Sequence, residues 1–235
     1  MRPRCLAAAL ADLGHEVARG TIANILHEHG IEPAPERDRH TRWATFLRAH
    51  RECLTATDFL SVEVRALKGL VTYYILFSID IASRSVHVAG ITPHPDGRWM
   101  NQMAQRHRSR RRFLRDTQDL ILDRDTKYSE EFRSALVREG IHLIRLPPRS
   151  PNSNAFAERF VRSIKSECLN RMIFFGQHSL RHAISQFMAH YHAERNHQGL
   201  ENRLVRPAPL VAPSQPVRRR QRLGGILNYY HRVAA

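Results

Sequence analysis

Several kinds of sequence feature are scarce in this chain, and each absence excludes a class of protein. Only three cysteines occur among the 235 residues (Cys5, Cys53 and Cys168), and no two of them form a Cys-x-x-Cys pair. The sequence therefore supports neither a disulfide framework nor a cysteine-ligated zinc site. No apolar run reaches the ~18 residues that a membrane-spanning helix needs. The short apolar run near the N-terminus meets acidic residues early and does not fit a signal peptide.

Acidic residues are also few in comparison with basic ones. The chain has 22 Asp and Glu against 37 Lys and Arg, which gives a formal net charge of +15. A charge of this size attracts a polyanion. Hydrophobic residues make up 42% of the chain, a normal proportion for a protein with a globular core. These bounds predict a cytoplasmic protein that contacts nucleic acid.

The first 30 residues have the pattern of two short helices around a turn. Leucines spaced three or four apart give the first helix an apolar stripe, and Thr21 is a candidate cap for a second helix that Gly30 ends. This pattern fits a helix-turn-helix, whose second helix enters a major groove, and it fits an ordinary helical hairpin equally well. Because two helices cannot bury a core alone, we expect 1–31 to be an N-terminally shortened remnant, followed by a linker over 32–48.

From residue 49 the pattern changes to strands, and later to alternating strands and helices. Short gaps between three β-rich runs predict an antiparallel meander over 55–64, 71–81 and 85–91. Further strands are expected at 120–123 and 141–146, and helices at 96–108, 129–140, 155–169 and 178–197. The sequence therefore predicts an α/β fold: a mixed five-stranded sheet flanked by helices. We expect this core to span 49–205 and to be followed by a basic, Pro- and Arg-rich tail over 206–235.

Three acidic residues stand at positions that one sheet can bring together. Asp58 lies in the first strand, Asp123 ends an apolar strand, and Glu158 lies in the first turns of a helix. A carboxylate at such a strand position is costly unless it is paired or binds a metal ion. Mg²⁺ and Mn²⁺ prefer carboxylate oxygens. Taken singly, each acid is more simply a strand-end or helix-surface residue, but the three together indicate a site for hard cations.

Four stretches of the chain carry a resemblance to a known family. They read TATDFLSVE, LDRDTKYSEEF, SPNSNAFAERFVRSIKSE and YHAERNHQGL. Over about 40–205, the chain resembles the integrase catalytic core of bacterial insertion-sequence transposases, the DDE recombinases related to retroviral integrases. The 34 residues between Asp123 and Glu158 are close to the family's spacing. The resemblance implies a ribonuclease-H-like fold and a site for two Mg²⁺ or Mn²⁺ ions that performs phosphoryl transfer on DNA.

The resemblance also assigns roles to the three acids. It implies that Asp58, Asp123 and Glu158 are both the catalytic residues and the metal ligands. Asp125 departs from the family pattern, which often has glycine there, and it is the alternative to Asp123 as a ligand. We prefer Asp123 because it ends the strand, whereas Asp125 lies past the strand end. Asp80 matches an aspartate of the family that has no metal role.

Basic residues follow Glu158 on the same predicted helix. Arg162 and Lys165 share its face at the spacings i+4 and i+7, and the resemblance places a DNA-contacting lysine at Lys165. Arg159 and Asn154 are further candidates for contact with DNA. The competing interpretations are a solvated basic face for the cations and a helix cap for Asn154.

Two further features have no settled chemistry. The motif His197-Gln198-Gly199-Leu200 matches a position shared by the family, but the resemblance implies no role for it. The arginine-rich runs at 106–115 and 218–222 are either solvated or a source of sequence-independent affinity for DNA.

Three functions are compatible with these observations. The first is a DDE transposase or integrase that cleaves and transfers DNA strands, as a homo-oligomer on transposon ends and target DNA, in the nucleoid-associated cytoplasm. The second is a truncated, non-catalytic DNA-binding regulator of transposition, which the shortened N-terminal segment favours. The third is a ribonuclease-H-like nuclease on RNA–DNA hybrids, which the helix-turn-helix pattern disfavours. The complete set of acids favours the first.

Overall fold

The computed structural model describes residues 17–30, 43–106, 114, 117–146, 154–207 and 215–232. The chain divides into two compact units, Met1–His50 and Arg51–Ala235. The described part of the first unit contains α2 (Arg19–Glu28) and α4 (Trp43–Ala49). No described helix is long and apolar enough to cross a membrane.

The helix α2 is the second helix of the predicted helix-turn-helix. Gly30 follows it with φ +68°, as expected of a residue that ends a helix. The predicted cap at Thr21 is wrong: α2 begins two residues earlier, after Ala18, and has no side-chain cap. The other predicted helix lies outside the described residues, so the helix-turn-helix stays a prediction.

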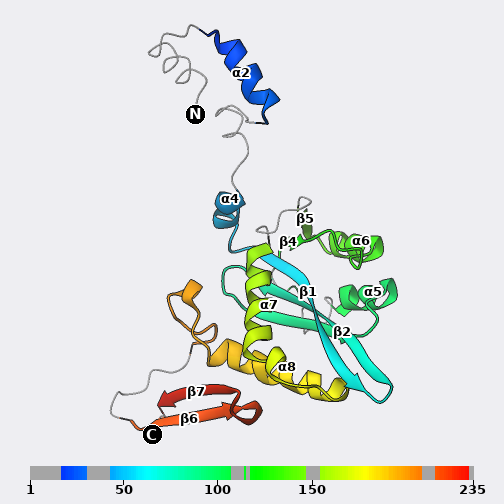
Figure 1. The fold of residues 1–235 in the computed structure, drawn as a ribbon, viewed down its shortest axis with the longest axis vertical. Coiled ribbons are helices and arrows are strands. Elements are labelled where there is room, and N and C mark those ends of the chain that lie inside the picture. The colour runs from blue at the N-terminus through cyan, green and yellow to red at the C-terminus, as the bar shows by residue number, and fades with distance from the viewer. Residues whose placement is uncertain are drawn as a thin grey trace. The chain divides into compact units, whose positions relative to one another are not determined.

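The second unit is built on a mixed five-stranded sheet (Figure 1). Its strands are β1 (Leu54–Ala66), β2 (Gly69–Asp80), β3 (Val86–Thr92), β4 (Asp119–Leu122) and β5 (His142–Arg145), in the order β3-β2-β1-β4-β5. The first three pair antiparallel, whereas β4 is parallel to β1 and β5 is parallel to β4. This arrangement confirms the predicted fold and is the ribonuclease-H-like order.

Helices cover both faces of this sheet (Figure 1). On one face lie α5 (Gly97–Arg106) and α6 (Glu130–Arg138), over a core that includes Leu120, Leu122 and Phe132. On the other face lie α7 (Ala155–Glu167) and α8 (Gly176–Ala193), where Phe160 of α7 packs on Phe77 of β2 with ring centroids 4.8 Å apart. Short 3-10 helices follow: η2 (Leu169–Arg171), η3 (Gln198–Leu200) and η4 (Leu223–Gly225).

The two ends of α6 show how individual residues determine where a helix begins and ends. Ser129 is its N-cap, and the Ser129 hydroxyl accepts a hydrogen bond of 3.3 Å from the Phe132 N–H. Gly140 has φ +81°, a left-handed conformation that glycine adopts without steric cost. Both residues were expected to bound this helix.

A β-hairpin lies beyond the core, within the segment that the sequence describes as a basic tail. It consists of β6 (Val217–Arg222) and β7 (Leu227–Arg232), and α8 contacts both strands. In β6, alternate side chains face the same side of the strand, and two of these, Arg220 and Arg222, reach Glu194 at the end of α8.

Glu194 is the anchor of this hairpin. Its side chain is 1% exposed, and its oxygens lie 2.7 and 2.9 Å from Arg222, 3.2 Å from Arg220 and 3.1 Å from His190. The hydrogen bonds from Arg222, supported by those from His190 and Arg220, lower the pKa of Glu194 to about 2. The carboxylate is therefore fully compensated by cations of the chain itself.

Candidate active site

The register of β1 and β4 brings two of the predicted acids side by side. Ala56 of β1 pairs with Ile121 of β4 in parallel register. Two residues further along each strand stand Asp58 and Asp123. Because Leu120 and Leu122 point into the core under α5 and α6, the alternate positions of β4, and Asp123 after them, point toward the α7 side.

The helix α7 brings the third acid to the same face. Asn154, at its N-cap, is buried and makes no cap hydrogen bond with its side chain; instead its Nδ2 donates to the Thr57 carbonyl at 3.3 Å. This bond ties the start of α7 to β1 next to Asp58. Glu158 lies four residues later on the same face of the helix and is partly exposed.

The pKa of Asp58 reflects both its burial and the acids close to it. Burial raises the pKa of Asp58 to about 7, and the carboxylates of Asp123, Glu158 and Asp125 add to the rise. A hydrogen bond of 2.7 Å from the Phe59 N–H opposes it. Among the described residues, Glu158 has Arg162 at 4.0 Å, whereas neither Asp58 nor Asp123 has a Lys, Arg or His nitrogen within 4.0 Å.

Asp125 has a different environment from Asp123. Its carboxylate pairs with Lys127 at 2.7 Å, and the Lys127 ammonium also lies over the rings of Phe59 and Tyr74. Asp123 instead accepts a hydrogen bond of 3.0 Å from the Asp125 N–H. The cation beside Asp125 makes it the poorer candidate for a metal ligand.

The donor set of the cluster fits a hard divalent cation. It consists of carboxylates, and the pKa of Asp58 is raised first by burial and then by the like charges of its neighbours. Beside it, the Oδ1 of Asn154 is buried without a hydrogen-bond partner among the described residues. The ligand oxygens of Asp58, Asp123 and Glu158 do not all lie within 4.8 Å of one another in the described structure.

Sequence reasoning did not single out Tyr128, which lies beneath the cluster. It is 1% exposed, it packs on Phe59 and Phe132, and its hydroxyl has no hydrogen-bond partner among the described residues. Burial raises its pKa well above the usual value, and Asp58 adds to this rise. A lone tyrosine in a turn gives no sequence signal for this position.

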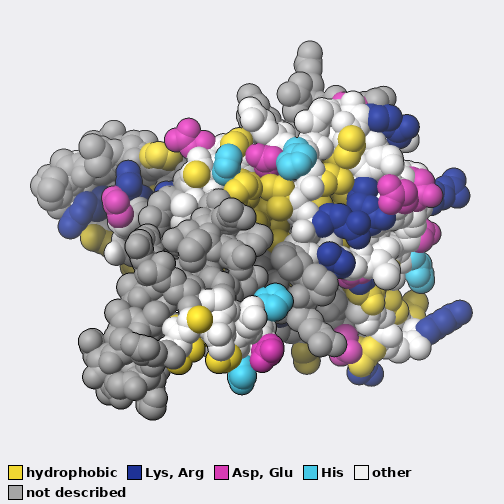
Figure 2. Space-filling view, turned by 90° about the horizontal axis from the view of Figure 1, so that it is seen from above, with side chains coloured by type: hydrophobic (Ala, Val, Ile, Leu, Met, Phe, Trp, Pro, Cys, Tyr) yellow, Lys and Arg dark blue, Asp and Glu magenta, His cyan; other side chains and the backbone are white. Residues whose placement is uncertain are grey.

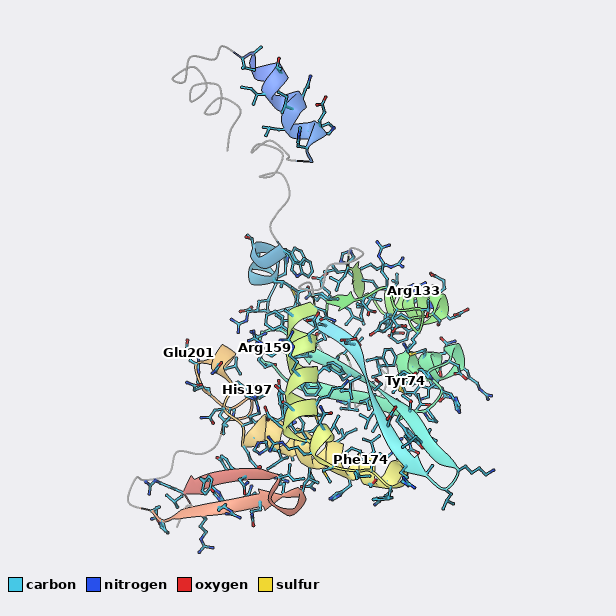
Figure 3. All side chains as sticks on the ribbon, viewed as in Figure 1. Tyr74, Arg133, Arg159, Phe174, His197 and Glu201 are labelled. Carbon is cyan, nitrogen blue, oxygen red and sulfur yellow. The ribbon has the colours of Figure 1, made fainter. Side chains whose placement is uncertain are left out.

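The basic residues of α7 point in two directions. Arg162 is exposed and lies 4.0 Å from Glu158, and Lys165 lines a shallow pocket against Ser61 and Glu63 of β1. Arg159 instead points toward the loop after α8, where His197 lies (Figure 3). Lys and Arg side chains also gather elsewhere on the surface, as Figure 2 shows for one face of the molecule.

The comparison with protein families agrees with this geometry. Residues 139–204 match the model of the family described as integrase core domain. The matched part runs from the end of α6 to the loop after η3 and includes Glu158, but not Asp58 or Asp123. The predicted resemblance to integrase catalytic cores is confirmed over this matched part of the chain.

Distant likenesses exist among solved structures, and the chain matches no curated protein sequence. One is the catalytic core domain of BIV integrase, with 15% identity, a TM-score of 0.43, and coverage of 63% of this chain and 88% of that one. Another is the catalytic core domain of HTLV-2 integrase in complex with magnesium, in a dimeric form. It has 13% identity, a TM-score of 0.48, and coverage of 63% of this chain and 92% of that one.

Proposed function

We propose that this protein is a DDE transposase or integrase that cleaves and transfers DNA strands with the help of two Mg²⁺ or Mn²⁺ ions. One observation carries the proposal: three carboxylates, from β1, from the residue after β4 and from α7, converge on one face. Burial, together with the charges of Asp123 and Glu158, raises the pKa of Asp58 there to about 7. Arrangements of this kind suit the binding of an external cation.

Each acid has a part in holding the ions. Asp58 and Asp123 come from adjacent strands, and Glu158 comes from the helix that Asn154 fastens to β1. When bound, two such ions lower the pKa of a water or a DNA 3′-hydroxyl and stabilise the leaving oxygen. Asp58 must lose its proton before it can serve as a ligand, so we expect binding of the ions to strengthen as the pH rises through about 7.

DNA is the substrate of this proposal. The net charge of +15 favours a polyanion, and Arg162 and Lys165 share the face of α7 that bears Glu158. They are placed to contact the phosphate backbone beside the acids. We further propose that the protein acts as a homo-oligomer on transposon ends and target DNA, in the cytoplasm where that DNA lies.

The experiment that tests this function measures nicking and transfer of labelled duplex DNA with Mn²⁺. Asp123→Asn and excess EDTA should each abolish the products, while Asp125→Asn should retain most of them, because Asp125 is already paired with Lys127. Both variants must show the thermal unfolding and near-UV circular dichroism of a folded protein. Loss of cleavage in Asp125→Asn, with Asp123→Asn active, would overturn the assignment of ligands.

A second outcome favours the non-catalytic alternative. If the wild-type protein and Asp123→Asn bind DNA equally and neither cleaves it with Mn²⁺ or Mg²⁺, the chain is a DNA-binding regulator of transposition. The N-terminal segment, predicted to be a helix-turn-helix, is the observation that keeps this function in consideration.

A further inference from the structure

A pocket lies beside α7, next to the acid cluster. Its volume is about 290 Å³, and it opens between α7, the turn after β2 and the loop around η3. Three arginines line it (Arg84, Arg159 and Arg195), and none of the described acidic residues does. Figure 3 labels Arg159 of α7 and His197 of the loop after α8, which both line this pocket. We call it the arginine pocket.

Arg84 is the most constrained residue of the arginine pocket. Its backbone has φ +62°, a left-handed conformation that residues with a side chain rarely adopt. Its guanidinium stacks on the Phe156 ring, 4.0 Å from the centroid, and donates to the Ile81 carbonyl at 2.6 Å. On the opposite wall is Gly199, where a Cβ atom would lie only 3.6 Å from the guanidinium nitrogens. The chain thus holds one cation in a fixed position.

Two of the three arginines have no ion pair among the described residues. Arg195 is paired with Glu167 at 2.7 Å, but neither Arg84 nor Arg159 has a carboxylate within 4.0 Å. Burial, together with the charges of Arg51 and Arg159, lowers the pKa of Arg84 to about 10, and the charge of Asp80 opposes this in part. At neutral pH Arg84 remains charged, so the arginine pocket has more positive charge than its one ion pair compensates.

The remaining walls supply neutral polar groups. The Nε2 of His197 lies 2.8 Å from the Tyr191 carbonyl, and burial lowers the pKa of His197, so the ring is neutral at pH 7 and donates this hydrogen bond. The Ser163 hydroxyl and the exposed Gln198 amide also line the pocket. His197 has no second N–H to donate and serves only as a wall, but guanidinium groups together with hydroxyl and amide donors are the groups that proteins use to hold phosphate oxygens.

We infer that the arginine pocket binds a backbone phosphate of the DNA strand whose neighbouring part lies at the acid cluster. The inference rests on the proposed function and adds a second point of contact to it. Arg159 directly follows Glu158, so the pocket and the acid cluster open on neighbouring sides of one turn of α7. A phosphate held at this point fixes the strand along its length without reading its sequence. The inference gives the His197-Gln198 motif a role as a pocket wall.

The test measures how DNA binding depends on salt, in the full chain without divalent ions. For duplex DNA, the logarithm of the association constant falls with the logarithm of salt concentration by about 0.9 per phosphate contact. Arg84→Gln should therefore lower this slope by about one contact and weaken binding ~3- to 10-fold near physiological salt, equally for unrelated sequences. Gln198→Glu, which adds an anion to the pocket and leaves Arg84 in place, should weaken binding in the same way.

Two control variants make the same changes of charge away from the pocket. Arg138→Gln in α6 is the control for Arg84→Gln, and Gln102→Glu in α5 is the control for Gln198→Glu. Both positions are exposed, and both variants should leave the salt dependence of DNA binding unchanged. If Arg84→Gln and Gln198→Glu both bind with the wild-type slope while the wild type cleaves DNA, the pocket inference fails and the proposed function stands. If both variants show the reduced salt slope but no preparation cleaves DNA, the arginine pocket binds a phosphate and the catalytic proposal fails.

A carboxylate of another protein subunit is the alternative anion that the arginine pocket can bind. If Arg84→Gln retains DNA binding but dissociates an oligomer in sedimentation measurements, the pocket is a subunit contact and the inference is overturned. A wild-type chain that binds no DNA overturns it as well, together with the proposed function.

Discussion

Two groups of carboxylates lie in the same unit and have opposite surroundings. At the end of α8, Glu194 is enclosed by Arg220, Arg222 and His190, and its pKa falls to about 2. In the acid cluster, burial raises the pKa of Asp58 to about 7, and the carboxylates of Asp123 and Glu158 add to the rise. The carboxylate that fastens one element to another is therefore surrounded by cations of the chain. Asp58 has no such partner within 4.0 Å among the described residues, and this is the carboxylate that we propose binds an external cation.

The largest expected effect comes from breaking the compensated group. Glu194→Gln keeps the shape of the side chain but leaves two arginines without their counter-ion, and we expect it to lower the free energy of unfolding by about 4 kcal/mol. Urea unfolding measures this loss, and limited proteolysis shows whether the hairpin β6-β7 is released first. Glu201→Gln is the matched control: its partner is Arg203 and both side chains are highly exposed, so the expected loss is below about 1 kcal/mol. Equal losses in the two variants would contradict the anchor role.

Lowering the pH should gradually weaken the ion pairs of Glu194. The folded-state pKa of Glu194, about 2, lies below its ordinary value of 4.5, so its contribution is present above pH 4.5 and is lost as the pH falls toward 2. This contribution is on the order of 3 kcal/mol. The difference in unfolding free energy between wild type and Glu194→Gln should therefore shrink as the pH falls from 6 to 3. A constant difference would mean that the charge of Glu194 is not what stabilises the hairpin.

Asp58 should behave in the opposite sense in the metal-free protein. Its folded-state pKa of about 7 lies above the ordinary 3.8, so the protein loses stability as the pH rises from about 4 to 7. In EDTA at pH 8, Asp58→Asn should be more stable than wild type by on the order of 2 kcal/mol, and the advantage should disappear near pH 4. Mn²⁺ should stabilise the wild type and not the variant. Destabilisation by Asp58→Asn in EDTA would show that the cluster is already compensated.

The smallest expected effect on stability concerns Asn154. Asn154→Ala removes the hydrogen bond to the Thr57 carbonyl and should cost about 1 kcal/mol in thermal or urea unfolding. Because the bond fixes α7 beside β1, the variant should also displace Glu158. Mn²⁺-dependent cleavage should therefore fall by a larger factor than the loss of unfolding free energy explains. Ser129→Ala, which removes the cap of α6 on the other face of the sheet, is a control of similar cost with cleavage retained. Unchanged cleavage in Asn154→Ala would remove its positioning role.

The sheet was predictable because its signals are local. Alternating or continuous apolar runs identify β1 to β5, and Ser129 and Gly140 bound α6 by their own chemistry. The convergence of Asp58, Asp123 and Glu158 was expected from their places at strand ends and from the resemblance. The structure adds what no local pattern contains, namely the register that aligns Asp58 with Asp123 and the bond from Asn154 to β1.

The arginine pocket and the Glu194 anchor were not predictable from the sequence. Arg84, Arg159 and Arg195 are far apart along the chain, and among the 37 basic residues only Arg159 of these three was a candidate for contact with DNA. Arg220 and Arg222 belong to the arginine-rich run 218–222, whose charge fits solvation as well as it fits contact with DNA. Which arginine has a counter-ion depends on tertiary contacts, and a sequence pattern does not record them.

The position of β1 between an antiparallel and a parallel neighbour has a consequence for the order of folding. Its pairing with β2 joins residues that are close in sequence, whereas its pairing with β4 must close a loop of more than 50 residues. Loop closure of that size is slow compared with hairpin formation. We therefore expect Asp58 to stand in a formed meander before Asp123 and Glu158 arrive. On the proposed function, the ion site is completed at the last stage, once the parallel strands and α7 have docked.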